Sequence, residues 1–507
     1  MRSDNSQIIS NTFFLYARLI IVSLVGLVVT RIILRNLGIN DFGIFSVVGG
    51  VVSLIGFVNT VMLSVSNRFI AYELGKGNDI SINRIFNINF NIHVFIAISV
   101  FVLGIPLGEW YINNYLNISH DKLLDAIWVY RFSLFGSVIS FIGVPYSGLL
   151  IAKEKFLLYS ISEITVSLCK LIIAYLIGFI ATQRLIIYAG LMAIVTTLPT
   201  IIYVVYSRKF NFELVRYKLF KKWSDYKEIF HFSIWVGYGA FASVSKAQGS
   251  NLIINYFFGA ALNAALGIAT TVNGIVITFA NSINRAIAPQ ITKSYAAGNI
   301  GRMEDLVIAA SKYTFFLILI PALPIFLEIE YLLNLWLIEV PKHTAIFIRL
   351  MMIDALIGSL NAGIPEAIFA SGKIKLYQLS INSVFLFSLP IAFVVLKLGA
   401  NPEALLYTYI GISIIALVLR QIILYYIVHF NTKRLILNSY FPSIFVLSSL
   451  LPFFFLSWCE FSSIFVMIIA DLYLILAIVL VGLNKNEKQF LKKRIHSAIS
   501  KKISWHE

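Results

Sequence analysis

Long apolar stretches alternate with short polar segments along almost the whole chain. A helix needs about 20 consecutive, mostly apolar residues to cross the hydrocarbon core of a bilayer. About fourteen stretches meet this requirement, which predicts an all-α polytopic membrane protein. The predicted spans are Asn11–Leu34, Phe42–Ile70, Ile88–Leu107, Ala126–Ile151, Phe156–Ala181, Leu185–Tyr206, Ile229–Phe258, Ala261–Gln290, Leu306–Leu327, Ala345–Ser371, Tyr377–Leu398, Glu403–Phe430, Phe441–Cys459 and Phe461–Leu483.

Two blocks of sequence recur at a spacing of about 220 residues. The first runs from Gly38, which aligns with Gly259, and needs no gap. The second is Gly-Val-Pro-Tyr, ending at Tyr146, which matches Gly-Ile-Pro-Glu, ending at Glu366. This pattern indicates an internal duplication of about half the chain, a plan that recurs in secondary transporters. The prolines of the second block are expected to kink their helices.

Each repeat contains about six predicted spans, an even number. Both halves are therefore expected to enter the membrane in the same orientation, as parallel repeats. The last two spans have no counterpart in the repeat. The predicted organisation is an N-terminal six-helix lobe at 1–207, a basic cytoplasmic inter-lobe loop at 208–228, a C-terminal six-helix lobe at 229–430, two additional transmembrane helices at 431–484 and a basic cytoplasmic tail at 485–507.

The composition supports this class of protein and sets the predicted orientation. The chain is 59% hydrophobic and only 13% charged, whereas soluble domains contain about 25% charged residues. The net charge of +16 comes from basic residues that gather in the loops of one side, so both termini are predicted to be cytoplasmic. This distribution fits contact with anionic membrane lipids and excludes nucleic acid as a partner. The N-terminus is not expected to be a removable signal peptide.

Charged residues inside the predicted spans are the strongest functional signal. A charge near the bilayer centre costs roughly 2.5–3.5 kcal/mol on insertion scales, so such residues usually face an interior cavity. The charged residues of interest are Arg18, Glu163, Lys170, Lys246, Arg285, Asp354 and Glu366.

A stripe of small and polar residues runs along the second span and recurs in the eighth. In the second span it comprises Ser46, Ser53, Thr60, Ser64 and Asn67, and in the eighth Gly267, Thr271, Gly274, Thr278, Asn281 and Arg285. Small residues also permit close helix packing, but an arginine in such a stripe requires a partner or water. Both stripes are therefore predicted to face a central hydrated cavity.

If the three cations Arg18, Lys246 and Arg285 line the same cavity, that cavity suits an anionic substrate such as a phosphate or pyrophosphate group. The candidate substrate-binding residues are Arg18, Lys246, Arg285, Asn281, Ser64 and Thr60. Each cation could instead pair with a carboxylate of a neighbouring helix. The candidates for binding a coupling cation, H⁺ or Na⁺, are Glu163, Glu366 and Asp354, and Glu366 could equally form a salt bridge to a cytoplasmic lysine.

Enzymatic chemistry is not indicated by the sequence. The seven histidines are scattered and the two cysteines lie in apolar runs, so neither a metal site nor a disulfide is predicted. Nucleotide-binding and catalytic-triad motifs are not evident, and we expect no catalytic residues and no cofactor.

The segment after the first span resembles a known superfamily. The pattern consists of Leu37, Gly38, Asp41, Phe42, Gly43 and Phe45. With the length and the arrangement of six, six and two spans, it is similar to the polysaccharide-transport branch of the multidrug/oligosaccharidyl-lipid/polysaccharide (MOP) superfamily, which includes O-antigen and capsule flippases.

The resemblance implies two six-helix lobes in a V-shaped arrangement, like that of multidrug and toxin extrusion (MATE) transporters, working by alternating access. It implies flipping of an undecaprenyl-pyrophosphate-linked oligosaccharide, the repeat unit of an O-antigen, capsule or exopolysaccharide, from the cytoplasmic to the periplasmic leaflet of a bacterial inner membrane. Other polysaccharide-assembly proteins would then be partners. Arg18 and Arg285 lie in the spans where related lipid II flippases carry arginines, which implies pyrophosphate contact for these two.

Two other functions stay open at this point. A MATE-like, cation-coupled drug or small-molecule antiporter would favour acidic groups in the N-terminal lobe, where Glu163 is the candidate. A membrane polysaccharide polymerase or glycosyltransferase would need a large periplasmic loop, and the longest predicted outer loop, Glu109–Asp125, is too small.

Overall fold

The structure is a computed structural model that describes residues 2–76, 79–153, 155–458, 463–484 and 487–489. For some residues in these ranges, residues 2–17 among them, the backbone alone is described. The regular elements of the described ranges are all helices, as the sequence predicts. The protein is therefore an all-α polytopic membrane protein with two compact units.

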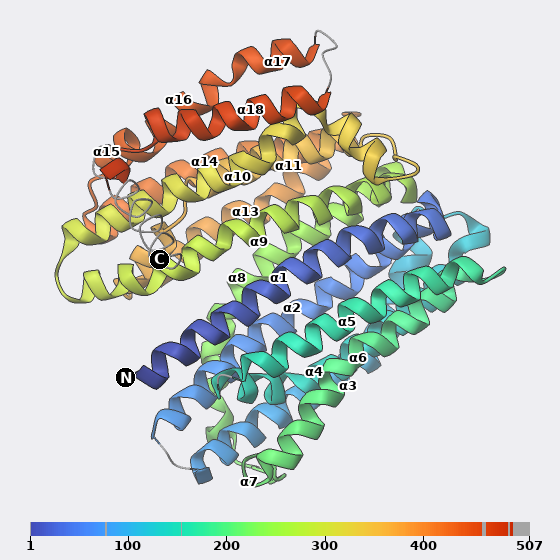
Figure 1. The fold of residues 1–507 in the computed structure, drawn as a ribbon. Coiled ribbons are helices and arrows are strands. Elements are labelled where there is room, and N and C mark those ends of the chain that lie inside the picture. The colour runs from blue at the N-terminus through green and yellow to red at the C-terminus, as the bar shows by residue number, and fades with distance from the viewer. Residues whose placement is uncertain (1, 77–78, 154, 459–462, 485–486, 490–507) are drawn as a thin grey trace, which may run out of the picture. The chain divides into compact units, whose positions relative to one another are not determined.

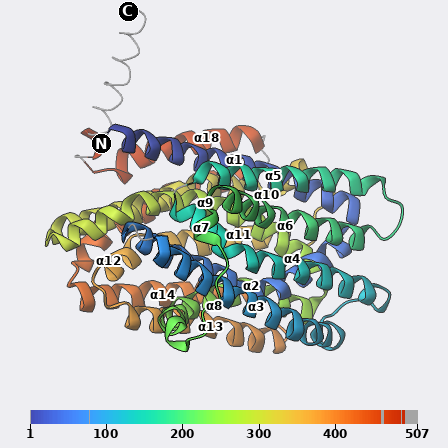
Figure 2. The ribbon, with the colours of Figure 1, turned by 90° about the horizontal axis from the view of Figure 1, so that it is seen from below.

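The first unit extends through Thr271 and adds the short segments Trp336–Thr344 and Phe385–Leu405. Its main elements are α1 (Arg2–Leu37), α2 (Ile39–Lys76), α3 (Asp79–Tyr115), η1 (His120–Lys122), α4 (Leu123–Ala152), α5 (Phe156–Leu176), η2 (Ile177–Phe179), α6 (Arg184–Phe210), the short α7 (Phe212–Val215), α8 (Trp223–Phe258) and the first part of α9 (Ala260–Ala296). Helices α1 and α5 lie side by side, and α4 and α6 lie between them and α3 (Figures 1 and 2).

The second unit comprises Val272–Leu335, Ala345–Val384 and the chain from Leu406 onward. Its elements are the rest of α9, α10 (Ile300–Trp336), α11 (Thr344–Ser359), α12 (Ile364–Ala370), the first part of α13 (Ile374–Lys397), α14 (Ala404–Val428), α15 (Thr432–Leu435), η3 (Ile436–Tyr440), α16 (Phe441–Ser449), α17 (Leu451–Trp458), α18 (Ser463–Ala477) and η4 (Ile478–Gly482).

Among the described residues, 12 helices are long and apolar enough to cross a membrane, or 13 if the bent pair Ile39–Leu54 and Gly56–Leu63 counts as one span. This agrees with the prediction of about fourteen. Helix α8 is not among these candidates. It is 36 residues long, but Lys246, Gln248 and Asn251 lower the hydropathy of its second half.

The predicted repeat is visible in where the helices begin and end. Helices α1 and α8, which are repeat partners, end at Leu37 and Phe258. The next helices, α2 and α9, begin directly after Gly38 and Gly259, whose φ angles are +82° and +81°. Glycine adopts this left-handed conformation without the strain that a Cβ atom causes. Helices α3 and α10 also begin and end at equivalent positions of the repeat, at Asp79 and Ile300 and at Tyr115 and Trp336.

The compact units do not follow the predicted lobe boundaries, because α8 packs along α2 within the first unit. The division into lobes at 1–207 and 229–430 therefore stays a prediction, as do the loop at 208–228 and the segments from 431 onward.

Close helix packing in the first unit depends on glycine. A Cβ atom on Gly136 would lie 2.6 Å from Thr196 Oγ1, and one on Gly143 would lie 2.3 Å from Thr200 Oγ1. Both contacts join α4 to α6. Small residues let membrane helices approach closely, and van der Waals packing supplies much of the association energy.

The two prolines of the repeat have different surroundings. Pro145 lies inside the continuous helix α4. Pro365 follows a break between α11 and α12, where Gly363 has φ +83° and Pro365 takes one of the first positions of the new helix. The expected kink thus becomes a complete interruption in the second copy.

Candidate functional site

The largest cavity among those found in the first unit lies where five helices meet, and we call it the five-helix pocket. Its volume is about 410 Å³, within the range of small-molecule sites. It is lined by Val29, Thr30 and Ile33 of α1, Phe42, Phe45, Ser46, Gly49, Gly50 and Ser53 of α2, Tyr188 of α6, Ala247, Gln248 and Asn251 of α8, and Gly267, Thr270 and Thr271 of α9.

The helices around this pocket approach closely on one side. A Cβ atom on Gly43 would lie only 1.8 Å from the carbonyl oxygen of Ala260, so the start of α9 rests directly on the backbone of α2. A Cβ atom on Gly267 would lie 2.9 Å from Ser46 Oγ. Gly49, in contrast, has nothing within 4 Å of its Cβ position. The pocket is the space left beside these contacts.

Two amide side chains of α8 supply the most polar part of the lining. Asn251 Nδ2 donates to Gln248 Oε1 at 3.1 Å, and Asn263 Nδ2 donates to the Asn251 carbonyl at 2.7 Å. Asn251 is only 7% exposed, and its Oδ1 atom has no hydrogen-bond partner within the described part of the chain. Because unsatisfied buried polar atoms are rare in native proteins, this oxygen is available to accept a hydrogen bond from a ligand.

The hydroxyl groups of the lining also present acceptors. Thr30 Oγ1 donates to the Gly26 carbonyl, and Thr270 and Thr271 donate to the Gly267 carbonyl, each at 2.9 Å. A hydroxyl that donates its single proton to its own helix keeps its lone pairs as acceptors. The lining therefore favours a ligand rich in O–H or N–H donors. The residues that line the five-helix pocket carry no formal charge.

A second, smaller cavity of about 260 Å³ adjoins this pocket between α2, α4 and α6. It shares Phe45, Gly49 and Ser53 with the five-helix pocket and adds hydroxyl groups, among them Ser133 and Thr196. The polar lining thus continues into the interior of the first unit.

The predicted stripe lies in this lining only in part, since Gly274 and Thr278 of α9 are described but do not line the pocket. Ser46 and Ser53 of α2 and Gly267 and Thr271 of α9 all line the five-helix pocket. The side chains of Thr60, Ser64, Asn281 and Arg285 lie outside the described part of the structure. Their role in substrate binding stays a prediction.

The two predicted cations with described side chains lie elsewhere. The Arg18 guanidinium lies 5.1 Å from the centroid of the Tyr159 ring on α5, and eleven residues of helix, about 16 Å, separate it from Val29. Lys246 Nζ lies 5.2 Å from the centroid of the Phe385 ring on α13. Such contacts are stabilising cation–π interactions. Neither residue lines the five-helix pocket.

The three acidic candidates belong to different units. Glu163 is half-buried on α5 in the first unit, whereas Asp354 and Glu366 belong to the second. Asp354 accepts a hydrogen bond from Ser413 Oγ. Glu366 Oε2 is buried without a hydrogen-bond partner in the described part of the chain, although the charge of Arg420 acts on this carboxylate.

Sequence reasoning missed Gln248 and Asn251 because it searched for charge. A usable signal exists in the sequence: Gln248, Asn251 and Asn255 recur about once per turn on one face of a helix that is otherwise largely apolar. Uncharged amides at this spacing indicate a polar face directed into the protein.

Comparison with protein-family models and with curated proteins finds no match. Solved structures with the same fold are found. A multidrug resistance MATE family transporter of the MOP superfamily, in an inward-facing conformation, matches with a TM-score of 0.65 and 11% identity over 81% of this chain and 96% of that chain. A MATE transporter in complex with MaL6 matches with a TM-score of 0.56, 11% identity and the same coverage.

The lipid II flippase MurJ, in an inward closed conformation, also matches. Its TM-score is 0.65 with 14% identity, and the match covers 92% of this chain and 98% of that chain. The protein therefore has the fold of MATE transporters and of this flippase.

Proposed function

We propose that the protein is a transporter that flips an undecaprenyl-pyrophosphate-linked oligosaccharide across a bacterial inner membrane. The observation that carries this proposal is the extent of the match to the lipid II flippase. It covers 92% of this chain and 98% of that chain, so nearly all of each protein belongs to the shared fold. A lipid-linked glycan is the substrate class that this similarity favours.

The C-terminal helices are the reason why the extent of the match to the flippase matters. Residues 1–430 are less than 92% of the 507-residue chain, so the match to the flippase must include residues after Phe430. The matches to the MATE transporters, at 81%, need not extend that far. A fold shared beyond the twelve repeat helices favours the flippase over a drug antiporter.

In the second unit these last helices are firmly integrated. Lys312 of α10 is 2% exposed and forms a salt bridge with Glu487 Oε2 at 2.6 Å. Ser439 Oγ donates to Ser311 Oγ at 2.8 Å, and a Cβ atom on Gly482 would lie 2.7 Å from the Phe316 ring. A buried charge that pairs across these elements would be costly to leave unpaired, so the segment after Phe430 is a structural part of the unit.

The five-helix pocket suits the sugar portion of such a substrate. Saccharides carry many O–H donors and apolar C–H faces. The pocket offers amide and hydroxyl acceptors, with the aromatic rings of Phe42, Phe45 and Tyr188 in its wall. An oligosaccharide can therefore exchange hydrogen bonds with water for hydrogen bonds with the lining.

The pyrophosphate requires cations, and we assign it to Arg18, Lys246 and Arg285. Thr60, Ser64 and Asn281 would contribute further polar contacts. Glu163, Asp354 and Glu366 are the candidates for H⁺ or Na⁺ coupling. Arg18 and Lys246 do not line the five-helix pocket, so the proposed contacts bind the charged pyrophosphate and the neutral sugars through different residues.

Complementation of a bacterial strain that lacks its surface-glycan flippase tests the function. Wild-type protein is expected to restore surface polymer and to remove the accumulated lipid-linked intermediate. Arg18→Ala, Lys246→Ala and Arg285→Ala are each expected to reduce polymer at least tenfold at equal membrane abundance. Lys209→Ala, at the end of α6, removes the same charge type outside the proposed site and serves as the matched control.

The alternatives predict different results. Export of a cationic drug by proteoliposomes, with no effect on the lipid-linked intermediate, would indicate a MATE-like antiporter and contradict the proposal. Longer polymer made from intermediate that another flippase has already moved would indicate a polymerase. Full polymer in all three cation variants would remove the proposed pyrophosphate contacts while leaving the function standing.

A further inference from the structure

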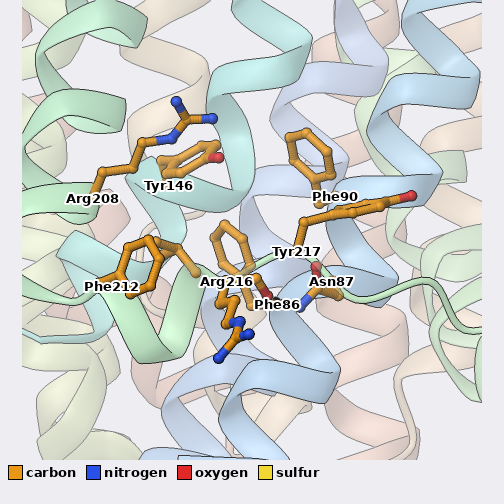
Figure 3. Close-up of a pocket in the computed structure, with 9 residues that line it drawn as sticks. Phe86, Asn87, Phe90, Tyr146, Arg208, Phe212, Arg216 and Tyr217 are labelled. Atoms are coloured by element: carbon orange, nitrogen blue, oxygen red, sulfur yellow. Dashed lines mark hydrogen bonds between the residues drawn. The ribbon is translucent and has the colours of Figure 1, made fainter.

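A third cavity lies at the other end of the first unit, and we call it the arginine pocket. Its volume is about 320 Å³. It is lined by Phe86, Asn87, Phe90, Tyr146, Arg208, Phe212, Val215, Arg216 and Tyr217 (Figure 3). Helix α6 contributes Tyr188 to the five-helix pocket and Arg208 here, and 20 residues of helix correspond to about 30 Å. The two pockets are therefore separated by about the thickness of a hydrocarbon core.

Buried asparagines hold the chain that forms one side of this pocket. Asn83 and Asn87 of α3 are 6% and 0% exposed, and their Nδ2 atoms donate to the Arg216 carbonyl at 2.9 and 3.0 Å. Asn87 Oδ1 accepts from the Lys218 backbone N–H at 3.0 Å. These bonds fix the backbone on both sides of Tyr217, so the pocket wall is built into the fold.

Lys153, at the end of α4, holds the same segment from another side. Its Nζ atom donates to Asn211 Oδ1 at 2.5 Å. Burial lowers the pKa of this lysine, and the nearby charge of Asp79 opposes that effect.

The base of the pocket is aromatic and rigid. The Phe86 and Tyr146 rings meet edge to face with centroids 5.0 Å apart, and the Phe90 and Tyr217 rings meet at 6.0 Å. Phe86 and Tyr146 are 1% and 5% exposed. Interlocked rings of this kind give an apolar surface whose shape does not depend on a bound ligand.

Within the described ranges, the arginines of the pocket are not paired with an acidic side chain. Figure 3 shows the Arg208 guanidinium beside the Tyr146 ring, with Arg216 on the other side of Phe86. None of the ion pairs found in the described part of the chain involves Arg208 or Arg216. In contrast, the nearby Arg84 is paired with Asp225 at 2.5 Å. Each guanidinium carries five N–H donors, so both retain donors for an anion.

The surroundings match the membrane interface. Phe210, Phe212, Tyr217 and Trp223 expose between 55% and 67% of their surface. Aromatic side chains gather at the level of lipid headgroups, where their rings meet the edge of the hydrocarbon. The loop that carries them is the most basic of the predicted cytoplasmic loops.

We propose that the arginine pocket binds the phosphate headgroup of an anionic glycerophospholipid, such as phosphatidylglycerol, from the adjacent leaflet. The Arg208 guanidinium binds the phosphate oxygens, and the aromatic base packs against the glycerol and the first methylene groups. The Arg216 guanidinium, on the other side of Phe86, adds to the positive potential that attracts the headgroup. Basic pockets beside transmembrane helices bind anionic headgroups in this way. This pocket is separate from the five-helix pocket and shares no residue with the proposed pyrophosphate contacts, and the proposal does not depend on the substrate of the transporter.

Native mass spectrometry of the full chain, with phosphatidylglycerol or phosphatidylcholine added in defined amounts, tests the proposal. The wild type is expected to retain one phosphatidylglycerol at least tenfold more tightly than phosphatidylcholine. Arg208→Gln and Arg216→Gln are each expected to weaken phosphatidylglycerol binding about fivefold, and the double variant more than tenfold. Lys221→Gln with Lys222→Gln removes the same charge from the same loop outside the pocket and should leave binding unchanged.

Competition identifies the bound chemistry. Glycerol 3-phosphate at the concentration of the lipid should not displace phosphatidylglycerol. If glycerol 3-phosphate displaces bound phosphatidylglycerol as effectively as the free lipid does, the pocket binds a soluble phosphate compound, and the lipid proposal is wrong. Preferential displacement by undecaprenyl pyrophosphate would assign the pocket to the transported substrate instead.

Equal binding by the arginine variants and the lysine variant would also refute the site. Melting temperatures of all variants, measured by intrinsic fluorescence in the same detergent, show whether a loss of binding reflects unfolding. Tyr217→Leu keeps both arginines and removes one aromatic wall, so it provides a variant in which the loss, about threefold, does not come from charge.

Discussion

The five-helix pocket and the arginine pocket belong to the same unit but use different chemistry. The five-helix pocket is lined by amides, hydroxyls, glycines and aromatic rings, without a charged residue in its lining. The arginine pocket is lined by aromatic rings and by two arginines, whose guanidinium groups lie on opposite sides of Phe86. The five-helix pocket lies along the inner faces of five helices. The arginine pocket lies where the aromatic and basic segment after α6 packs against α3 and α4.

This difference follows from the cost of burying charge. A charged side chain at mid-membrane depth costs several kcal/mol, whereas a neutral amide costs less and can still offer a strong acceptor. Near the interface, water and snorkelling remove most of the penalty for arginine. A chain of this kind can therefore recognise neutral groups within the bilayer and anionic groups at its edge.

The largest effect is expected from a substitution at Gly43. It should disrupt the five-helix pocket and leave the arginine pocket intact. Gly43→Ala places a Cβ atom 1.8 Å from the Ala260 carbonyl oxygen, and a backbone atom cannot move aside as a side chain can. We expect a cost at or above the upper end of the roughly 1–3 kcal/mol typical of overpacking. The five-helix pocket should be lost, with a melting temperature lower by several degrees and a reduced yield of monodisperse protein.

Gly49→Ala is the matched control, because nothing lies within 4 Å of the Cβ position of Gly49. Its melting temperature and yield should equal those of the wild type. An equally stable Gly43→Ala variant would show that α2 and α9 do not meet as described. Phosphatidylglycerol binding in any folded Gly43→Ala protein should persist, because the arginine pocket does not involve this contact.

Filling the five-helix pocket should abolish transport without unfolding the protein. Gly49→Leu directs a branched side chain into open space that is shared by the five-helix pocket and the smaller cavity beside it. We expect surface polymer to fall at least tenfold in the complementation assay, while the melting temperature changes little. Wild-type polymer from Gly49→Leu, at equal abundance, would exclude the pocket from the transport path.

The sequence was sufficient to predict the helical membrane fold because each span needs a long apolar run. The repeat added the equivalence of helix ends, which Gly38 and Gly259 confirm by their matching φ values. The candidate site was less predictable. Charged residues inside an apolar sequence predict a binding site, and this criterion selects Arg18 and Lys246. The five-helix pocket instead presents the uncharged side chains of Gln248 and Asn251.

The two proline motifs show why local pattern alone is insufficient. Gly143 and Gly363 occupy equivalent positions in nearly identical motifs. Gly143 stays in a continuous helix, where Thr200 packs against it, whereas Gly363 has φ +83° at a break, with Ala310 and Val307 against it. Packing from other helices, which the motif does not contain, decides between the two outcomes.

A moderate effect is expected from the asparagines that hold the wall of the arginine pocket. Asn87→Ala removes the bond to the Lys218 N–H and one of the two bonds to the Arg216 carbonyl, which keeps its bond from Asn83. Leaving the Lys218 N–H without this partner costs about 1–3 kcal/mol. Faster proteolysis between Arg216 and Lys222, with weaker phosphatidylglycerol binding, is the expected result. Asn113→Ala, on the exposed end of the same helix, should change neither, and transport should continue in both variants.

The smallest effect is expected from the ion pair beside the arginine pocket. Arg84 and Asp225 lie 2.5 Å apart, with side chains 52% and 13% exposed, and pairs as accessible as this contribute roughly 0–1 kcal/mol. A double-mutant cycle of Arg84→Gln and Asp225→Asn, measured by thermal unfolding, should give a coupling energy below about 1 kcal/mol that decreases further at high salt. A larger, salt-independent coupling would mean that charge at this end of the unit stabilises the fold. A small one would agree with the proposal that charge at this end of the unit serves lipid binding more than stability, in contrast to Lys312, which is buried and paired in the second unit.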